Sequence, residues 1–140
     1  AKTDESFGPK IGTYIESSVR DNPRSRVPER IRQLSMGVFG HTNVADLRYQ
    51  LLHAVAGTLI EAKNQGASVA VLVIHEFVPV GRKSDKAREN EEDLATFIER
   101  LSERLHTLPT SRLIGPFHVP GSGKIPSNIP LYIGKIETVC

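Results

Sequence analysis

An apolar run near the middle of the chain constrains its fold more than any other feature. Residues 68–77, Ser68 to Phe77, are rich in β-branched side chains and do not alternate between polar and apolar positions. Such a run predicts a strand that is covered on both faces, as in α/β sheets. Its longest apolar stretch, Val69 to Ile74, is about a third of the roughly 20 residues that a membrane span requires.

The segment before this strand predicts a long amphipathic helix from Asn43 to Gln65. Asn43 is a suitable capping residue for its start, and Gly66 is a suitable residue for its end. A continuous apolar stripe follows the helical period and consists of Val44, Leu47, Leu51, Val55 and Leu59. At 1.5 Å per residue the helix would be roughly 33 Å long, so we expect it to be a central element.

The remaining segments complete an α/β pattern. Helices are predicted at Pro9–Arg20, at Glu29–Val38 after Pro28, and from an Asn90 cap to near Pro109. Residues 79–89 read as an exposed charged loop, and strands are predicted at Arg112–Val119 and Pro130–Thr138 on either side of a turn-rich connection. We expect one α/β domain over residues 1–140, with a central mixed sheet flanked by helices.

The amino-acid composition indicates a cellular compartment for the protein but not a function. The 140 residues are 39% hydrophobic with a formal charge of +2, which resembles an ordinary soluble protein more than a dedicated polyanion binder. The single cysteine, Cys140, cannot form an internal disulfide, and no signal peptide or membrane anchor is apparent. We therefore expect a cytoplasmic protein. The oligomeric state does not follow from the composition.

Most catalytic motifs fail on specific residues. The segment Gly121–Lys124 resembles a phosphate loop, but His118 and Ile125 occupy positions that require glycine and Ser or Thr. The chain has no Gly-x-Ser-x-Gly elbow and no His-x-x-x-His pair. His75 and Glu76 follow the apolar run at a strand end where α/β proteins often bind ligands. Because neighbouring strand residues point to opposite faces, these two cannot share one pocket without a bulge.

Two segments resemble the PD-(D/E)xK nuclease superfamily. Members carry a carboxylate, one intervening residue and a lysine on a strand, and Lys2 matches that lysine. They also place a glutamine near an arginine or tyrosine on the following core helix, which Leu47-Arg-Tyr-Gln50-Leu-Leu-His-Ala54 resembles. The strand at residues 69–77 fits their order of elements. The resemblance implies a restriction-endonuclease-like core that lacks its N-terminal hairpin within these residues.

The resemblance also implies a chemistry and a partner. Carboxylates of the family hold a divalent ion such as magnesium, which activates water to attack a phosphodiester. Lys2 and Gln50 would be the catalytic residues, and Arg48, Arg24, Arg26 and Arg30 would bind nucleic-acid phosphates. The motif's carboxylates would precede Ala1, so the metal ligands are unknown. The chain would be part of a longer domain or an inactive descendant.

Three other interpretations stay open. In the first, the chain is a non-enzymatic module that contacts protein or nucleic acid through Asn22–Arg32 and residues 79–89. In the second, a small anionic ligand binds near His75, Glu76 and the turn at Gly121–Lys124. In the third, the singled-out residues have structural roles only: Lys2 is solvated, Arg48 pairs with a neighbouring carboxylate and Gln50 lies on the polar side of its helix.

Overall fold

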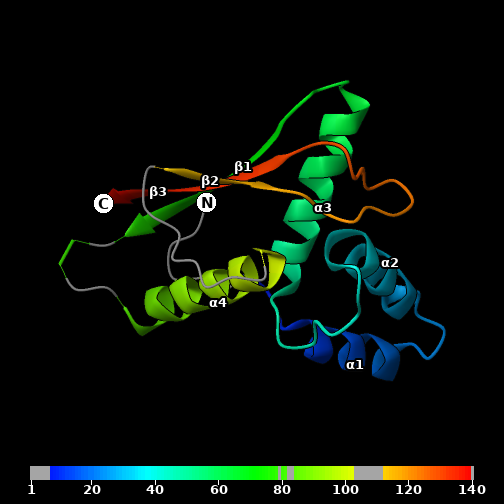
Figure 1. Ribbon diagram of the computed structural model, residues 1–140. Coiled ribbons are helices and arrows are strands. Elements are labelled where there is room, and N and C mark those ends of the chain that lie inside the picture. Colours follow the sequence, from blue (N-terminus) through cyan, green and yellow to red (C-terminus); the bar gives the residue numbers. More distant parts are fainter. Residues whose placement is uncertain (1–6, 79, 82–83, 103–111, 140) are drawn as a thin grey trace.

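The computed structural model describes residues 7–78, 80–81, 84–102 and 112–139 (Figure 1). Four helices and three strands follow one another in the order α1 (Ile11–Asp21), α2 (Val27–Phe39), α3 (Tyr49–Asn64), β1 (Ala70–Val78), α4 (Asp85–Ser102), β2 (Leu113–Phe117) and β3 (Leu131–Val139). The expected α/β class is confirmed, as is the order of helix, strand, helix, strand and strand from α3 onward.

The sheet is mixed, as predicted. Its strand order is β1-β3-β2, with β1 parallel to β3 and β2 antiparallel to β3. The parallel register pairs Ala70 with Leu131 at one end and Val78 with Val139 at the other, so both strands end at the same edge. The parallel pair requires a crossover, and α4 and β2 lie between its two strands in the sequence.

Helices cover one face of the sheet. Helix α4 lies along that face, and α3 crosses the end at which β1 and β3 begin (Figure 1). The core between them includes Phe97 and Ile98 of α4 and Leu131 and Ile133 of β3, which are each at most 1% exposed. This inner face follows the alternation of the strand, because every second residue of β3 points toward α4.

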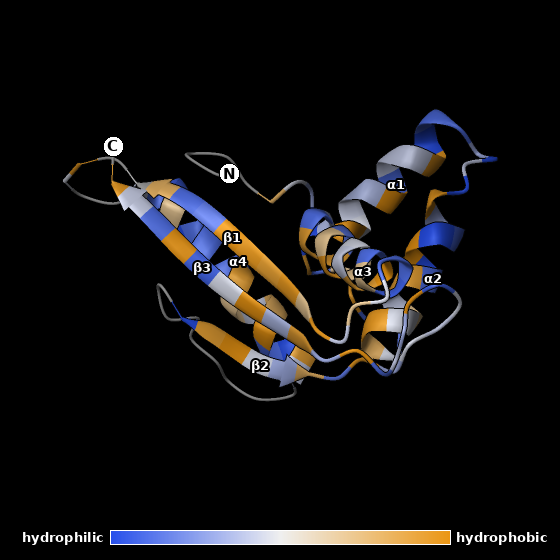
Figure 2. Cartoon of the chain, turned by 90° about the horizontal axis from the view of Figure 1, so that it is seen from above, coloured by the Kyte–Doolittle hydropathy of each residue, from blue (hydrophilic) through white to orange (hydrophobic). Residues whose placement is uncertain are grey.

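The opposite face of the sheet is open, which contradicts the prediction of a strand covered on both faces. Seen from above, no described helix lies over β1 and β3 (Figure 2). Val71 and Val73 point to this side and are 45% and 47% exposed. The apolar run misled the prediction because its outward residues are as apolar as its inward ones. Composition alone does not distinguish a covered strand from an uncovered one.

Helix α3 begins six residues later than predicted, at Tyr49 instead of Asn43. The preceding residues form a turn whose backbone pairs with the start of α1: Ile11 N donates to Leu47 O at 2.8 Å and Gly12 N donates to Ala45 O at 3.0 Å. Val44 and Leu47 belong to the predicted apolar stripe and are both 2% exposed, but they are buried from this turn and not from a helix. The end of the helix agrees with the prediction, since Gly66 adopts a φ of 67°.

The two N-terminal helices lie close to their predicted positions. Helix α2 carries Pro28 in its first turn and ends at Phe39, and the following Gly40, with a φ of 79°, caps the last carbonyls. Inside α2, Gly37 packs against the connection between β2 and β3, where a Cβ atom would lie 2.6 Å from Ile125 Cδ1. The small residue at this position therefore lets α2 approach the chain that enters β3.

Helix α4 begins five residues earlier than the predicted Asn90 cap. Ser84 occupies the capping position, because its hydroxyl accepts a hydrogen bond from Ala87 N at 3.1 Å. Asn90 lies inside the helix and is 1% exposed. The predicted charged loop thus ends at Ser84, and the predicted helix end near Pro109 lies outside the described residues. None of the described helices has the length and hydropathy needed to cross a membrane.

Candidate functional site

A buried ion pair joins the two parallel strands on the inner face of the sheet. Lys135 Nζ of β3 lies 3.0 Å from Glu76 Oε2 of β1, and each side chain is only 6% exposed. Burying two charges is costly unless the pair is close and further hydrogen-bonded. The other carboxylate oxygen, Glu76 Oε1, is buried and has no hydrogen-bond partner among the described residues. The pair therefore costs desolvation energy that an apolar pair would not.

Two further glutamates converge on the same ammonium. Glu137, two residues along β3, has Oε1 3.1 Å from Lys135 Nζ, and Glu91 of α4 has Oε1 3.4 Å from it. Their side chains are more exposed than the inner pair, at 23% and 37%. Three carboxylates thus surround one ammonium near the end of the parallel strands, and we call this set the Lys135 cluster.

The charge of Lys135 is stabilised in this environment. Burial by itself lowers the pKa of the ammonium, but the hydrogen bonds and charges of Glu76 and Glu137 outweigh burial and raise the pKa above its usual value. Lys135 is therefore a permanent cation at neutral pH. It is a hydrogen-bond donor to the carboxylates and not a proton acceptor for catalysis.

The sequence contained a signal for this cluster that the prediction did not use. In β3 the inward positions are Leu131, Ile133, Lys135 and Glu137, which follow the period of a strand. In β1, Glu76 lies six residues after the buried Ala70, an even number, so both side chains point to the same face of the sheet. A charged residue that continues an inward apolar series predicts a buried charge, although its partner on another strand follows only from the register.

The Lys135 cluster does not fit a divalent metal ion. Its three carboxylates converge on the lysine, which occupies the place that a cation would need. Across the described part of the chain no group of three or more His, Cys, Asp or Glu side chains could hold a metal ion. The magnesium implied by the nuclease resemblance therefore has no ligand set among these residues.

His75 and Glu76 point to opposite faces of the sheet, as the alternation predicts. His75 Nε2 lies 2.7 Å from Thr138 Oγ1 on the open face, and its ring stacks on Phe77 with centroids 4.4 Å apart. The turn at Gly121–Lys124 precedes β3 and lies at the other end of the sheet from Glu76 (Figure 1). The joint pocket for a small anionic ligand, predicted from these segments, is therefore not formed.

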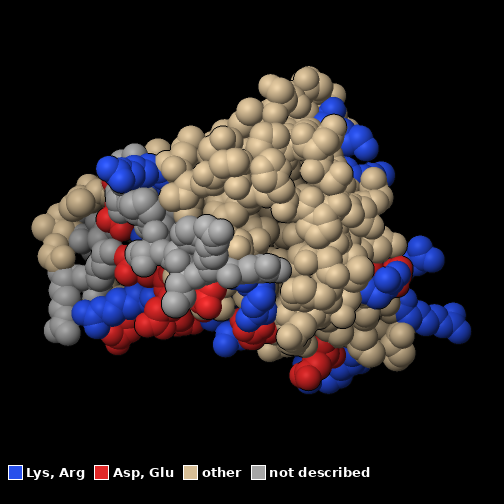
Figure 3. All heavy atoms as spheres, in the orientation of Figure 1, with Lys and Arg blue, Asp and Glu red and all other residues tan. Residues whose placement is uncertain are grey.

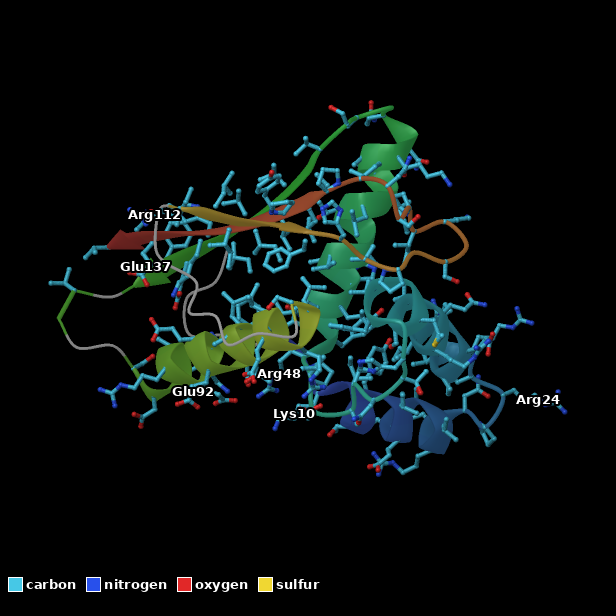
Figure 4. The ribbon with its side chains drawn as sticks, in the orientation of Figure 1. Lys10, Arg24, Arg48, Glu92, Arg112 and Glu137 are labelled. Carbon is cyan, nitrogen blue, oxygen red and sulfur yellow. The ribbon has the colours of Figure 1, made fainter. Side chains whose placement is uncertain are left out.

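Arg48 is held by carboxylates of α4. Its Nε donates to Asp93 at 2.8 Å, its Nη2 to Glu89 at 2.6 Å and its Nη1 to the carbonyl oxygen of Gly8 at 3.1 Å. The side chain is 13% exposed and lies between the start of α3 and α4 (Figure 4). These contacts favour the structural interpretation of Arg48 over phosphate binding, because the guanidinium is already neutralised.

The other three predicted arginines have a different environment. Arg24, Arg26 and Arg30 are exposed around the connection between α1 and α2, and Arg24 projects away from the sheet at the far end of the molecule (Figure 4). No ion pair involves these three side chains within the described residues, whereas the neighbouring Arg32 binds Glu29 at 2.8 Å. We call Arg24, Arg26 and Arg30 the arginine corner.

An aromatic pair joins α1 and α3. The rings of Tyr14 in α1 and Tyr49 in α3 meet edge to face with centroids 4.6 Å apart, and His53 lies 5.8 Å beyond Tyr49. Burial raises the pKa of Tyr49, Tyr14 raises it further, and the positive charge of Arg30 acts in the opposite direction. Arg30 therefore acts on Tyr49 electrostatically, and both tyrosine rings are half-buried.

The two predicted catalytic residues lie on either side of the boundary of the described chain. Gln50 is exposed in the first turn of α3, and its backbone N donates to Phe7 O at 3.3 Å. Its side chain packs on Gly8, where a Cβ atom would meet Gln50 Cγ at 2.9 Å. Lys2 lies outside the described residues. The approach of Lys2 to Gln50 stays a prediction.

Comparison with known proteins places the chain in a family. A family model described as "Domain of unknown function (DUF6946)" matches residues 1–140. The chain belongs to the DUF6946 family. No curated protein and no solved structure matches it.

Charge is segregated along this DUF6946 domain. The segment from Arg20 to Arg32 contains five arginines and two carboxylates, whereas α4 contains six carboxylates and three basic residues. In the space-filling view, acidic side chains gather over α4, and basic side chains project from the end that carries α1 and α2 (Figure 3). The small net charge of +2 therefore hides two regions of opposite sign.

Proposed function

We propose that this DUF6946 domain binds nucleic acid through the arginine corner. The observation that carries the proposal is the exposure of Arg24, Arg26 and Arg30 without an ion pair among the described residues. A guanidinium group that lacks a carboxylate partner is available for bidentate hydrogen bonds to phosphate. Such contacts release condensed counterions, which supplies most of the affinity in binding that does not depend on sequence.

The position of the corner supports the same function. The acidic α4 lies in another part of the domain, so the local potential at the corner is more positive than the net charge indicates. A negatively charged polymer would approach the domain at the end that carries α1 and α2. This geometry favours an anionic partner over an apolar or cationic one.

The pair of Tyr14 and Tyr49 favours a strand with accessible bases. Bases of single-stranded nucleic acid stack on aromatic side chains, and each stack contributes about 1–3 kcal/mol. Tyr14 and Tyr49 are half-buried, so their rings are held in place while parts of them stay accessible. We therefore expect single strands to bind more tightly than duplexes of the same length.

Fluorescence anisotropy with labelled oligonucleotides tests this function. We expect the wild-type chain to bind single-stranded DNA at low salt, with an affinity that falls linearly on a plot of log K against log salt. The triple variant Arg24→Ala, Arg26→Ala, Arg30→Ala should lower the slope by up to about 2, since each phosphate contact on a single strand contributes roughly 0.7. Its affinity at low salt should fall at least tenfold.

A matched control removes three exposed basic groups elsewhere. Lys63, Arg88 and Arg112 lie on α3, on α4 and before β2, and the triple alanine variant changes the net charge by the same amount. Its affinity should stay within about threefold of the wild type at moderate salt, where screening confines charge effects to about 10 Å. Equal losses in both triple variants, or no binding by the wild type at low salt, would refute the arginine corner as the interface.

A second candidate function is catalysis of the nuclease type. One observation favours it: Gln50 N is hydrogen-bonded to Phe7 O, and Lys2 precedes Phe7 by five residues. The resemblance to PD-(D/E)xK nucleases would give Lys2 and Gln50 the catalytic roles, with the metal ligands still unidentified.

Cleavage assays separate catalysis from binding. The catalytic proposal predicts magnesium-dependent cleavage of DNA that is lost in Lys2→Ala and Gln50→Ala, while both variants keep the wild-type binding affinity. Absence of cleavage by the wild type with magnesium would reject catalysis. The binding proposal would be unaffected, since the anisotropy experiment tests it independently.

A further inference from the structure

The open face of the sheet is a continuous apolar surface. Its outward residues on β1 are Val71, Val73, His75 and Phe77; those on β3 are Tyr132, Ile136 and Thr138; and Leu113 of β2 lies over Gly134. Ile136 and Leu113 are 44% and 53% exposed, close to the values for Val71 and Val73. An apolar patch of a few hundred Å² is often a functional surface of a protein.

The polar groups on this face are already satisfied by one another. His75 and Thr138 are hydrogen-bonded across β1 and β3 at 2.7 Å, and the His75 ring stacks on Phe77. None of the outward positions of β1 and β3 carries Asp, Glu, Lys or Arg. Covering the face would therefore remove apolar surface from water without leaving a charge unpaired.

The dimensions of the face fit a small protein interface. Nine residues at about 3.3 Å each and three strands about 4.8 Å apart give roughly 30 by 14 Å, or about 400 Å² in projection. The accessible surface of projecting side chains exceeds this projection. The weakest specific interfaces bury less than about 600 Å² per partner, so the face has the area of a weak complex.

We propose that a second copy of this chain covers the open sheet face, so that two sheets pack face to face about a two-fold axis. The absence of charge on this face permits such an occupant. A two-fold interface places the same surface against itself, and a charged surface would then meet like charges. This face carries none, and packed sheets with apolar inner faces, about 10 Å apart, are a common architecture. The lack of basic residues excludes nucleic acid as its occupant.

The proposal is independent of the arginine corner. The corner lies around the α1–α2 connection, whereas the proposed interface lies on the far side of the sheet from α4. A dimer would therefore carry two arginine corners, both outside the proposed interface. Failure of either proposal leaves the other intact, because the two rest on separate residues and different physical interactions.

Sedimentation velocity over a range of concentrations tests the dimer. We expect the wild-type chain to show a reversible monomer–dimer equilibrium in the micromolar range, which high salt does not weaken because burial of apolar surface drives it. The double variant Val73→Lys, Ile136→Lys places like charges across the interface and should weaken dimerisation more than tenfold. Circular dichroism and thermal unfolding would show that this variant folds.

A matched variant controls for added charge. Val19 and Met36 lie on α1 and α2 with exposures of 38% and 37%, and Val19→Lys, Met36→Lys should dimerise like the wild type. Sedimentation of the wild type as a monomer at every soluble concentration would overturn the proposal. So would equal weakening by both double variants.

Hydrogen exchange distinguishes face packing from edge pairing. Strand β1 is at the edge of the described sheet, and its outer backbone groups could pair with β1 of a second copy. Pairing of that kind would slow exchange of the β1 amides as the concentration rises. Face-to-face packing leaves those edge amides unpaired, so concentration-dependent protection of β1 would overturn the proposed arrangement even if a dimer forms.

Discussion

Lys135 shows how one side chain joins three elements of the domain. Its ammonium forms ion pairs with Glu76 on the neighbouring strand, Glu137 on its own strand and Glu91 on α4. One positive charge therefore links both strands and the helix. A protein with a buried ion pair of this kind is often no more stable than one with apolar residues of the same size in its place. Removal of one partner, however, leaves the other charge buried without a counter-ion. The cluster therefore fixes how β1, β3 and α4 meet more than it adds stability.

Replacement of Lys135 alone should be strongly destabilising. We expect Lys135→Met to lower the free energy of unfolding by about 3–5 kcal/mol, because Glu76 would stay buried without its cation. The double variant Glu76→Met, Lys135→Met should recover most of the loss, since Glu91 and Glu137 are exposed enough to be hydrated. Urea denaturation measures both, and equal losses in the single and double variants would contradict the role assigned to the ion pair.

The pH dependence of stability should reveal the same lysine. The pKa of Lys135 is raised in the folded state, so its protonated form stabilises the fold fully below the unfolded-state pKa of about 10.4. This contribution is lost as the pH rises through the folded-state pKa. We expect the wild type to lose stability above about pH 10 more steeply than the Glu76→Met, Lys135→Met variant. Urea midpoints measured from pH 8 to 11 give the difference, and parallel curves would contradict it.

At the scale of single elements, packing decides which residues of a helix matter. Gly37 and Gly57 both lie inside helices, yet a Cβ at Gly37 would meet Ile125 Cδ1 at 2.6 Å and a Cβ at Gly57 would meet nothing within 4 Å. Glycine has a poor helix propensity at either position. Only at Gly37 is a small residue required by a neighbouring segment.

The two glycines provide a matched pair of variants. We expect Gly57→Ala to raise the free energy of unfolding by about 0.5–1 kcal/mol through helix propensity. Gly37→Leu should lower it by about 1–3 kcal/mol, because the side chain overpacks the contact with Ile125. Thermal unfolding monitored by circular dichroism measures both changes. Destabilisation by Gly57→Ala, or stability of Gly37→Leu at the wild-type level, would show that the described packing of these helices is wrong.

At the scale of the whole molecule, the separation of charge matters more than the net value. The acidic side chains of α4 and the arginine corner belong to different parts of the fold, so the distance between them sets how strongly they interact in salt (Figure 3). Near-neutral proteins with such an arrangement orient an approaching polyanion without binding it over their whole surface.

Salt should determine whether α4 influences nucleic-acid binding. Glu92 and Glu99 are exposed on α4, and Glu92→Gln, Glu99→Gln removes two negative charges away from the arginine corner. We expect this variant to bind single-stranded DNA several-fold more tightly at about 10 mM salt, where charges interact over about 30 Å. At about 150 mM salt the affinity should match the wild type, because screening then acts within about 8 Å. Anisotropy titrations at both salt concentrations test this, and an equal gain at both would mean that α4 contacts the DNA directly.

The sequence by itself determined the elements whose signals are local. Helical periodicity predicted α1 and α2, the β-branched run predicted β1, and Gly66 marked the end of α3, because each signal lies within a few residues. The same reasoning placed His75 and Glu76 on opposite sides of their strand. It also identified the exposed arginines as candidates for anion binding, although their freedom from ion pairs required the structure.

Only the tertiary structure decided which of these residues meet. The start of α3 moved to Tyr49 because backbone groups of residues 45–47 bind the start of α1, a contact between segments more than 30 residues apart. The carboxylate partners of Arg48 lie on α4, and the register of β1 against β3 brings Glu76 of β1 to Lys135 of β3. The amino-acid composition likewise could not predict that one face of the sheet is uncovered. Apolar residues predict that a surface should be buried, but only the arrangement of the helices shows whether the described chain buries it.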